Sequence, residues 1–590
     1  MKERVIVFIR ERTGIHRLAP GSLPGVSPMP GSGPGGMASM VEGGASFAYV
    51  FGAVLVFLLG LEALTGLALA AFYSPSSTDA WGSVAYIEDQ GAWGWLIRGL
   101  HHHGAGAIVI VAGAHLVQTA IAGAYKRPRE LVWWLGIVLL VLVLAWAITG
   151  YVRPWDQARY WANRVEVGIA VGTPLLSGLM KQLALGGNDY GNLTLTRFYM
   201  LHVALLPVLV TGLVIAHVLL ARRHGLTAMR SGGAVPRWPN QALLDVTAMA
   251  VVFAVLLAFV ASQGGVGLAA PADPSQAYDA RPLWYFRWLF ELRELAGPAE
   301  QFAAMAAPAM VGGFLIALPI LDKGRERSPR RRRLWLGSLA GVLALIGALT
   351  VASFVRDGGD AELAKRRAEA DRLALRAREI ARQYGVPAAG GGEIWSMAPM
   401  WRGRVLFAKM CAGCHDAASE PKDRIGPTIE PGHGDRAWLR AFIKAPSDPR
   451  FWGKTKLAKN EAAMKSAAQL ELSPETLDEL VELLVAQAGA TDVDPQKVAR
   501  GKEAFEKCSD CHSLDEGVSG SGPALFGLHS RAFYLSFISN PKLPVHMGPD
   551  KSEMPRFDGD LSLADRDALA EYLAWLRTAT PADLDRLGPL

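Results

Sequence analysis

Four cysteines near the C-terminal end of the chain form two copies of the pattern Cys-x-x-Cys-His. The residues that define the pattern are Cys411, Cys414 and His415 in the first copy, and Cys508, Cys511 and His512 in the second. Two thiols at this spacing bond the vinyl groups of a haem, and the histidine that follows ligates its iron. A zinc site is the alternative, but zinc would require a different pairing and would not explain a histidine after both pairs. The pattern therefore predicts two covalent c-type haems and leaves no cysteine for a disulfide.

The two motifs lie in an internal repeat, because each is followed by a Gly-Pro pair and then by an amphipathic helix. The sixth iron ligand of each haem is expected to be methionine, which gives a higher reduction potential than a second histidine. Met554 is predicted for the second motif, with Met547 as a weaker rival. Met464 is predicted for the first motif, where His433 or another ligand remains an alternative.

Two further pairs of histidines lie in apolar segments, where polar side chains are costly and usually functional. His101 and His115 are fourteen residues apart, so on a helix they fall within about 40° of one face and about 21 Å apart along the axis. His202 and His217 are fifteen apart, offset by about 60°. Each histidine could simply bond a neighbouring helix. Two matched pairs instead predict two non-covalent bis-histidine haem b sites, His101 with His202 on the outer side and His115 with His217 on the cytoplasmic side.

Other residues near these histidines fit the same prediction. His102 and His103 point away from the face of His115 and are expected to be interfacial. Arg98 lies one turn before His101 and could pair with a haem propionate, or be an ordinary interfacial arginine. Glycine lets a neighbouring group approach the backbone closely. Four glycines repeat the fourteen-residue spacing and are expected to make room for haem: Gly52, Gly66, Gly136 and Gly150.

The segments that must position the histidines are long and apolar. The chain has 590 residues, of which 51% are hydrophobic and only 19% charged. A membrane-spanning helix needs about 20 mostly apolar residues. Seven segments qualify: 47–72, 103–123, 131–152, 199–221, 243–262, 301–321 and 334–354.

The charges between these segments predict the orientation. The loops after the second, fourth and sixth segments are rich in lysine and arginine, whereas the opposite loops are mixed or acidic. Basic loops favour the cytoplasmic side, so the N-terminus is predicted there, in a bacterial inner membrane, with the Cys-x-x-Cys-His segments in the periplasm. The net charge of +6 comes from these loops, and no basic face interleaved with aromatics suggests nucleic acid.

Several motifs in residues 45–355 resemble the cytochrome b subunit of quinol-oxidising cytochrome bc complexes. They are the segments Trp95–His101, Lys126–Glu130, Gly150–Gln157 and Leu195–Phe198. The spacing from His202 to His217 and the seven segments resemble the chloroplast branch, with its two polypeptides joined. In that branch a cysteine tethers an extra haem, but this chain has Val50 at that position.

The resemblance implies an outer pocket for quinol oxidation and a cytoplasmic pocket for quinone reduction. The matching outer-pocket residues are Tyr151, Trp155, Pro282, Trp284 and Tyr285. One departure concerns chemistry: the family loop normally carries glutamate where this chain has Leu283, which can neither accept nor donate a proton. Asp279, Glu291, Glu294 or ordered water are the expected alternative proton routes.

The predicted fold is all-α, with a seven-helix transmembrane cytochrome b bundle followed by two small class I cytochrome c domains. The predicted divisions are an N-terminal amphipathic segment and linker at 1–46, a dihaem core at 47–240, a three-helix part with the quinol loop at 241–355, a charged helical linker at 356–394, and cytochrome c domains at 395–490 and 491–590.

The resemblance also implies a Rieske iron–sulfur partner, which must be another chain because no cysteines are spare for a cluster. A homodimer within a larger complex, contact with membrane lipid, and a soluble or membrane-bound periplasmic electron acceptor are further expectations. The favoured function is quinol:cytochrome c oxidoreduction coupled to proton translocation. The alternative, favoured by Leu283, is a non-catalytic electron conduit whose quinol pocket is vestigial.

Overall fold

A computed structural model describes residues 12–13, 40–171, 178, 181–182, 185–186, 189–225, 227, 232–324, 326–415, 426–452, 455 and 464–587. Most of residues 1–46, including the predicted amphipathic segment and linker, lie outside this part. The chain divides into two compact units, Met1–Gly392 and Glu393–Leu590. The predicted boundaries inside each unit remain predictions.

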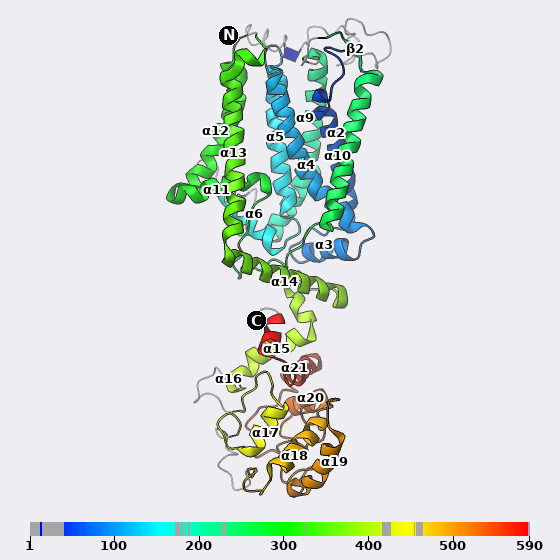
Figure 1. Cartoon of the computed structure of the whole chain (residues 1–590), viewed down its shortest axis with the longest axis vertical. Coiled ribbons are helices and arrows are strands. Elements are labelled where there is room, and N and C mark those ends of the chain that lie inside the picture. Colours follow the sequence, from blue (N-terminus) through cyan, green and yellow to red (C-terminus); the bar gives the residue numbers. More distant parts are fainter. Residues whose placement is uncertain are drawn as a thin grey trace. The chain divides into compact units, whose positions relative to one another are not determined.

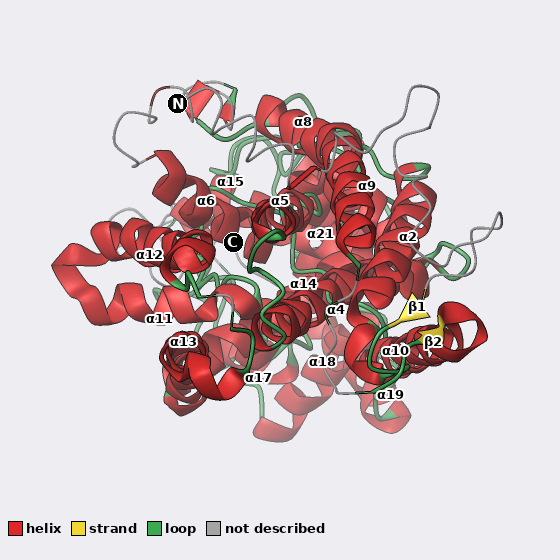
Figure 2. Cartoon of the chain, turned by 90° about the horizontal axis from the view of Figure 1, so that it is seen from above, coloured by secondary structure: helices red, strands yellow, loops and turns green. Residues whose placement is uncertain are grey.

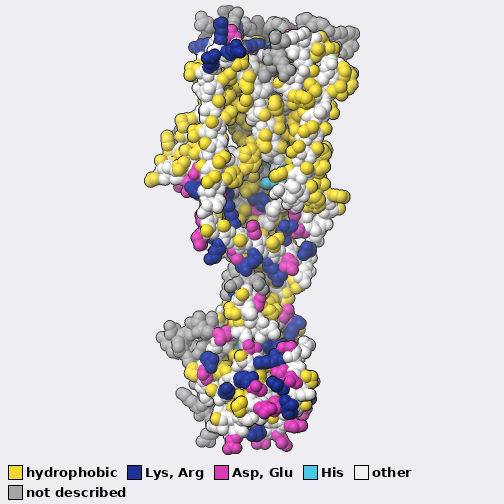
Figure 3. Space-filling view, viewed as in Figure 1, with side chains coloured by type: hydrophobic (Ala, Val, Ile, Leu, Met, Phe, Trp, Pro, Cys, Tyr) yellow, Lys and Arg dark blue, Asp and Glu magenta, His cyan; other side chains and the backbone are white. Residues whose placement is uncertain are grey.

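The first unit is a bundle of helices, as Figures 1 and 2 show. Its described residues contain seven helices long and apolar enough to cross a membrane, which confirms the predicted number of spans. Their bounds are Phe51–Ala70 (α2), Gly94–Ile121 (α4), Glu130–Tyr151 (α5), Asn192–His224 (α8, η3 and α9), Arg237–Gln263 (η4 and α10), Trp284–Leu321 (η5, α11 and α12) and Pro329–Gly359 (η7 and α13). Hydrophobic side chains cover much of this unit's visible face in Figure 3.

One end of the bundle carries the basic loops. Lys126 donates hydrogen bonds to Asp322 at 2.7 Å and to the carbonyl of Gly324, so the loops after the second and sixth spans meet. Arg129 bonds the carbonyl of His224 at 2.7 Å, which adds the loop after the fourth span. The strands β1 (Met40–Val41) and β2 (Val235–Pro236) pair antiparallel and join the beginning of the first span to the same loop. The three basic loops therefore lie at one end of the bundle, as the sequence predicted.

The opposite end is closed by shorter helices: α3 (Ala80–Asp89), α6 (Gln157–Val171), the first part of the sixth span, α11 (Arg287–Ala296), and α14 (Ala361–Tyr384). Asp357 anchors this end. It is buried near the end of α13 and accepts hydrogen bonds from Arg281, Arg287 and Arg367. This single carboxylate ties the segment before Leu283 to α11, α13 and α14.

The second unit contains α15 (Pro399–Met410), α16 (Ala412–His415), α17 (Arg436–Lys444), α18 (Pro474–Gln487), α19 (Pro495–Ala504), η10 (Phe505–Cys508), α20 (Arg531–Ser539), α21 (Leu563–Leu576) and α22 (Pro581–Arg586). Asp435, Ser473, Ser530 and Ser562 cap α17, α18, α20 and α21 through their side-chain oxygens, in the usual way for a helix N-terminus. The helix packing crosses the predicted boundary at residue 490: α15 packs against α21, and α18 packs against α19.

Candidate haem and quinol sites

The outer histidine pair lies between the second and fourth spans. The rings of His101 and His202 lie opposite each other, nearly perpendicular, with centroids 6.1 Å apart. A metal–nitrogen bond of about 2 Å on each side fits within this separation. Thr65 Oγ1 lies 3.1 Å from Nδ1 of His101, and the carbonyl of Trp146 lies 3.1 Å from Nδ1 of His202. With Nδ1 engaged in each ring, both Nε2 atoms are left to bind iron, so the pair fits a haem.

The inner pair is built on the same two helices. His115 and His217 are close enough to interact electrostatically. Each of the four glycines lies next to one of these histidines. A Cβ built on Gly66 would lie 2.9 Å from Cε1 of His101, and on Gly150 2.5 Å from Cε1 of His202. The corresponding distances are 4.0 Å from Gly52 to His115 and 3.3 Å from Gly136 to His217.

Two charged residues lie near the outer pair, and sequence reasoning assigned no role to either. Glu62 of α2 is buried, and its Oε2 lies 2.9 Å from Nδ1 of His101. Arg153 lies over the ring of Tyr73, close to His202, and its Nε has no hydrogen-bond partner among the described residues. Arg98, the predicted propionate partner, is instead buried in an ion pair with Glu88 at 2.6 Å and bonds the carbonyl of Val266 at 2.7 Å. Arg153 is therefore the better placed arginine for a propionate.

His102 and His103 lie beside His101 but are not facing His202. The ring of His103 packs edge-on against Phe259 at 5.0 Å and lies within 3.3 Å of the Gly265 carbonyl. The ring of His102 packs against that of His103 at 4.9 Å. Neither ring is opposed by a second histidine of the fourth span in the part of the chain that the structure describes.

The two cysteine motifs share one local geometry. Nδ1 of His415 lies 2.8 Å from the carbonyl of Pro427, and Nδ1 of His512 lies 2.7 Å from that of Pro523. The Gly-Pro pair after each motif therefore orients the histidine and leaves Nε2 available. Burial lowers the pKa of both imidazoles, so each is neutral near pH 7, which is the form that ligates a metal.

Room for a prosthetic group is visible beside the second motif. A hollow of about 480 Å³ is lined by His512 together with Phe505, Leu514, Val518 and neighbouring small residues. Each motif histidine also packs closely against a glycine. A Cβ on Gly522 would lie 2.8 Å from Cε1 of His512, and a Cβ on Gly426 would collide with His415, so a larger residue at either position would displace the imidazole. The donor sets at both motifs thus fit covalent haem.

The predicted quinol residues gather at the end of the bundle that carries α6 and α11. Trp284 and Tyr285 form η5, with ring centroids 5.3 Å apart, directly after Pro282 and Leu283. Trp284 reaches α4, where a Cβ on Gly106 would lie 3.4 Å from its Nε1. Tyr151 interacts electrostatically with Tyr285. Trp155 is buried against Tyr160 and belongs to the local core.

The carboxylates expected to replace the missing loop glutamate are held in ion pairs. Asp279 pairs with Arg366 at 2.5 Å, Glu291 with Arg356 at 2.8 Å, and Glu294 with Arg356 at 3.4 Å. An arginine that donates to a carboxylate occupies the oxygen that would otherwise receive a proton. None of these three is therefore well placed to carry a proton from quinol.

Glu166 of α6 is a carboxylate that sequence reasoning missed. Its Oε1 is inaccessible to solvent and has no hydrogen-bond partner among the described residues. Asn163 Nδ2 donates to Oε2 at 3.3 Å, and burial raises the pKa of Glu166 to about 8. It interacts electrostatically with the phenols of Tyr285, Tyr151 and Tyr190. The sequence signal was weak, being one acidic residue in an amphipathic helix.

Comparisons with known proteins agree with both halves of the chain. The family model described as cytochrome b/b6/petB matches residues 37–225, and the model described as cytochrome c matches residues 498–577. Cytochrome b6 of Prochlorococcus marinus (strain NATL1A) is 36% identical over 179 residues, covering 30% of this chain and 82% of the relative. The menaquinol:cytochrome c reductase cytochrome b subunit of Bacillus subtilis (strain 168) is 37% identical over 184 residues, covering 31% and 82%. A solved chain of a hyperthermophilic respiratory Complex III has a TM-score of 0.48 at 26% identity, over 58% of this chain and 92% of its own.

Proposed function

The chain belongs to the cytochrome b/b6 family, and we propose that it is the haem-carrying subunit of a quinol:cytochrome c-type oxidoreductase. It is a multi-pass membrane protein that combines a cytochrome b part with a cytochrome c part. A relative in Bacillus subtilis is named for the oxidation of menaquinol and the reduction of cytochrome c, which supports the same reaction class here. The observation that most supports the proposal is the outer histidine pair. Trp284 of the quinol loop contacts α4, the helix that carries His101, so the predicted quinol residues lie on the same helix as a predicted haem ligand.

In the proposed reaction, quinol is oxidised at the outer pocket to quinone, two electrons and two protons. One electron goes to a Rieske iron–sulfur partner and on to the cytochrome c unit. The other crosses the membrane through the histidine pairs to a quinone on the cytoplasmic side, which couples the reaction to proton translocation. When bound, two b haems and two c haems supply the one-electron chemistry. In this proposal the chain forms a homodimer in the inner membrane. Its cytochrome c segments lie in the periplasm and pass electrons to a periplasmic acceptor.

The chain's own side chains hold the reactants. Thr65 and the Trp146 carbonyl orient the outer histidines, and the Pro427 and Pro523 carbonyls orient the histidines of the two cysteine motifs. Pro282, Trp284 and Tyr285 line the outer pocket together with Tyr151. Leucine at position 283 favours the second candidate, a conduit that only passes electrons, unless another group accepts the proton.

Glu166 is the group that we propose for this proton. The phenols Tyr285, Tyr151 and Tyr190 interact with it electrostatically. Gln301 of α12 (Glu300–Leu321) donates to the Ile169 carbonyl of α6 at 3.3 Å. No arginine is paired with Glu166 among the described residues, in contrast to the outer-loop carboxylates. A buried, unpaired carboxylate whose pKa is raised towards neutrality suits a general base.

Replacing Glu166 by glutamine is expected to slow quinol oxidation by about a hundredfold, which is typical for the loss of a general base. Because the carboxylate accepts a proton only when ionised, the wild-type rate should rise with pH around the Glu166 pKa of about 8. The Glu166→Gln protein should lack that rise. Adding Leu283→Glu to this variant should restore part of the rate.

Glu294→Gln is the matched control, because Glu294 is an exposed carboxylate of the same end of the bundle that pairs with arginine. It should keep the wild-type rate and pH profile. A Glu166→Gln complex with full haem content and an unchanged pH profile would show that the proton leaves by another group.

The haem content tests the proposed function itself. A pyridine haemochrome assay on the purified chain should give two haem b and two haem c, a ratio of 1:1. Haem staining should persist on denatured chain, because thioether bonds survive denaturation. Any other ratio, or the loss of all stain, would contradict the proposal.

A further inference from the structure

The two cytochrome c repeats exchange helices. In a chain of two independent repeats, the helix before each cysteine motif would pack against the last helix of its own repeat. Here α15 packs against α21 and α18 packs against α19. The contacts are close: a Cβ on Gly403 of α15 would collide with the Ala568 carbonyl of α21, and a Cβ on Gly501 of α19 would collide with the Glu479 carbonyl of α18. Each pair of helices thus depends on glycine at the crossing.

A short connection explains this exchange. Only residues 488–494 separate the end of α18 from the beginning of α19. A short connection between two helices favours packing them as antiparallel neighbours. Once α19 is paired with α18, α15 must find its partner in the second repeat, as it does with α21. Short hinge loops favour the exchange of elements between like domains in the same way.

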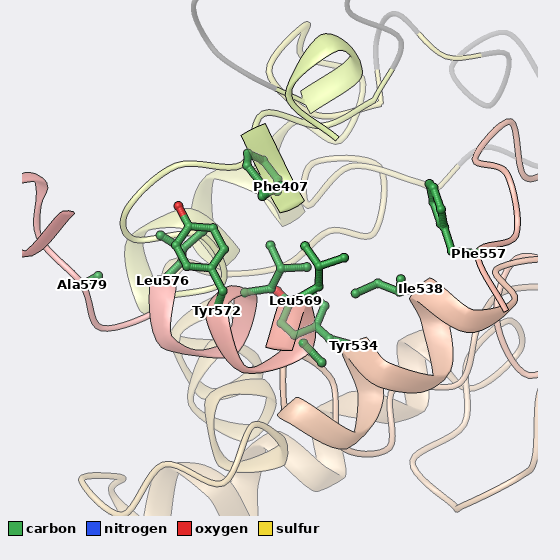
Figure 4. Close-up of a cluster of buried hydrophobic side chains, with 10 residues drawn as sticks. Phe407, Tyr534, Ile538, Phe557, Leu569, Tyr572, Leu576 and Ala579 are labelled. Carbon is green, nitrogen blue, oxygen red and sulfur yellow. The ribbon is translucent and has the colours of Figure 1, made fainter. Parts of the chain in front are cut away.

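The hydrophobic cores follow the exchanged helices. One core joins Phe407 of α15 to residues of α20 and α21, and Figure 4 shows Phe407 facing Tyr572 and Leu569. Cys411 and Met554 both pack against this core. The core therefore brings the first cysteine motif together with the methionine of the second repeat.

The other core makes the reciprocal pairing. Met464 packs against a cluster of α17 and α18 residues, and Leu525 and Leu528, which follow the second cysteine motif, pack against the same cluster. Leu525 also packs in the cluster of Leu480, Leu483 and Phe505 together with Cys508. The methionine of the first repeat thus lies on the side of the second motif.

In each repeat a loop joins the cysteine motif to the next helix, α17 or α20, and these two loops meet at a pair of histidines. The rings of His433 and His529 lie 5.3 Å apart, and Trp438 packs against His529 at 5.5 Å. Nearby, Gly432 donates its N–H to the carbonyl of Leu576, the last residue of α21, at 2.8 Å. His433, an alternative iron ligand from the sequence, is buried in this crossing.

From these contacts we propose that the iron ligands of the c haems are exchanged between the repeats. The haem on Cys411 and Cys414 takes His415 and Met554, and the haem on Cys508 and Cys511 takes His512 and Met464. This inference rests on the proposed function only in requiring two covalent haems. It keeps both methionines that the sequence predicted and reverses their partners. Neither haem site is complete without side chains from both repeats.

Single-haem chains test the pairing directly. In the full-length chain, Cys411→Ala with Cys414→Ala leaves only the haem of the second motif, and Cys508→Ala with Cys511→Ala leaves only that of the first. In the first of these chains, Met464→Leu should abolish the near-infrared methionine–iron absorption band, and Met554→Leu should leave it unchanged. The second chain should show the reverse. Met547→Leu is the control and should leave the band in both.

The opposite pattern, with Met554→Leu removing the band of the second motif's haem, would overturn the exchange.

A chain that carries both c haems provides a second test in case a single-haem chain does not fold. Arg402 of α15 pairs with Asp565 of α21 at 2.7 Å, so in an Arg402→Lys chain a carbodiimide should join the amine at position 402 to Asp565, which peptide mass spectrometry detects. A chain with Arg402→Lys, Asp565→Asn and Thr476→Asp, which moves the carboxylate to the equivalent position of α18, should give no cross-link between positions 402 and 476.

A cross-link between positions 402 and 476, and none between 402 and 565, would also overturn the exchange. Failure of the haem content on which the proposed function rests gives a different result, because the wild-type chain would then contain no covalent haem to begin with. A chain with two covalent haems and ligands paired within each repeat would retain the proposed function and reject the exchange.

Discussion

Replacing His202 by alanine is expected to remove the outer b haem and leave the inner b haem and both c haems in place. His202 faces His101 at 6.1 Å, and its Nδ1 is held by the Trp146 carbonyl, so alanine removes one of two iron ligands and the group that positions it. The haem b content should fall by half. The same result is expected for His101→Ala, whereas His115→Ala and His217→Ala should remove the inner haem.

The measurement is a redox titration of the b haems together with the pyridine haemochrome ratio. His102→Ala is the matched control, because His102 neighbours His101 in the same helix but packs against His103. It should retain both b haems. If His102→Ala removed a b haem and His101→Ala did not, His102 and not His101 would be the iron ligand of α4.

Replacing Asp357 by asparagine is expected to destabilise the quinol-pocket end of the membrane unit. Three arginines donate to this buried carboxylate: Arg281 next to the quinol loop, Arg287 of α11 and Arg367 of α14. Removing one partner of a buried ion cluster leaves uncompensated charge, at a cost of about 3 kcal/mol. The melting temperature in detergent should fall by several degrees, and KM for quinol should rise because Arg281 adjoins Pro282.

Asp279→Asn is the control for Asp357→Asn. Asp279 pairs with Arg366 in the same region, but both side chains are about half exposed. Exposed pairs contribute about 1 kcal/mol or less. Equal effects of the two substitutions on melting and on KM would contradict the role given to Asp357.

Much of the membrane half could be predicted because its signals are periodic. Length and hydropathy identify the seven spans, and the helical repeat aligns His101 with His115 and His202 with His217 along two helices. The glycines at the same spacing lie against those histidines. The spacing of the residues in each of these features depends only on one helix, and the periodicity of a helix is fixed by its backbone.

The partners that sequence reasoning did not find depend on contacts between distant segments. Arg98 bonds Glu88 and Val266, and no local pattern links these three residues. Among the described residues Glu166 has no arginine partner while Asp279, Glu291 and Glu294 each have one, and all four look alike in the sequence. Which carboxylate meets an arginine is decided by tertiary packing, so only the structure distinguishes a proton acceptor from an ion-pair partner.

In the cytochrome c half, too, local features could be predicted from the sequence and contacts between distant segments could not. The motifs, the Gly-Pro turns and the two methionines follow from local sequence. Their pairing does not, because the exchange of α15 and α19 between repeats depends on how the connection at residues 488–494 folds. A short connection and a repeated sequence are compatible with either pairing until the helix contacts are known.

Reduction of b haem and c haem by quinol, measured together in the purified complex, tests the central claim most directly. The inner quinone site is blocked by an inhibitor, quinol is added to the oxidised complex, and both absorbance changes are followed by rapid mixing. If quinol is oxidised at the pocket of Tyr151, Trp284 and Tyr285, b haem and c haem should be reduced together, one electron to each branch. Reduction of c haem with no b haem reduction under any inhibitor would contradict the proposed function. The second candidate, a conduit that only passes electrons, would then be the function.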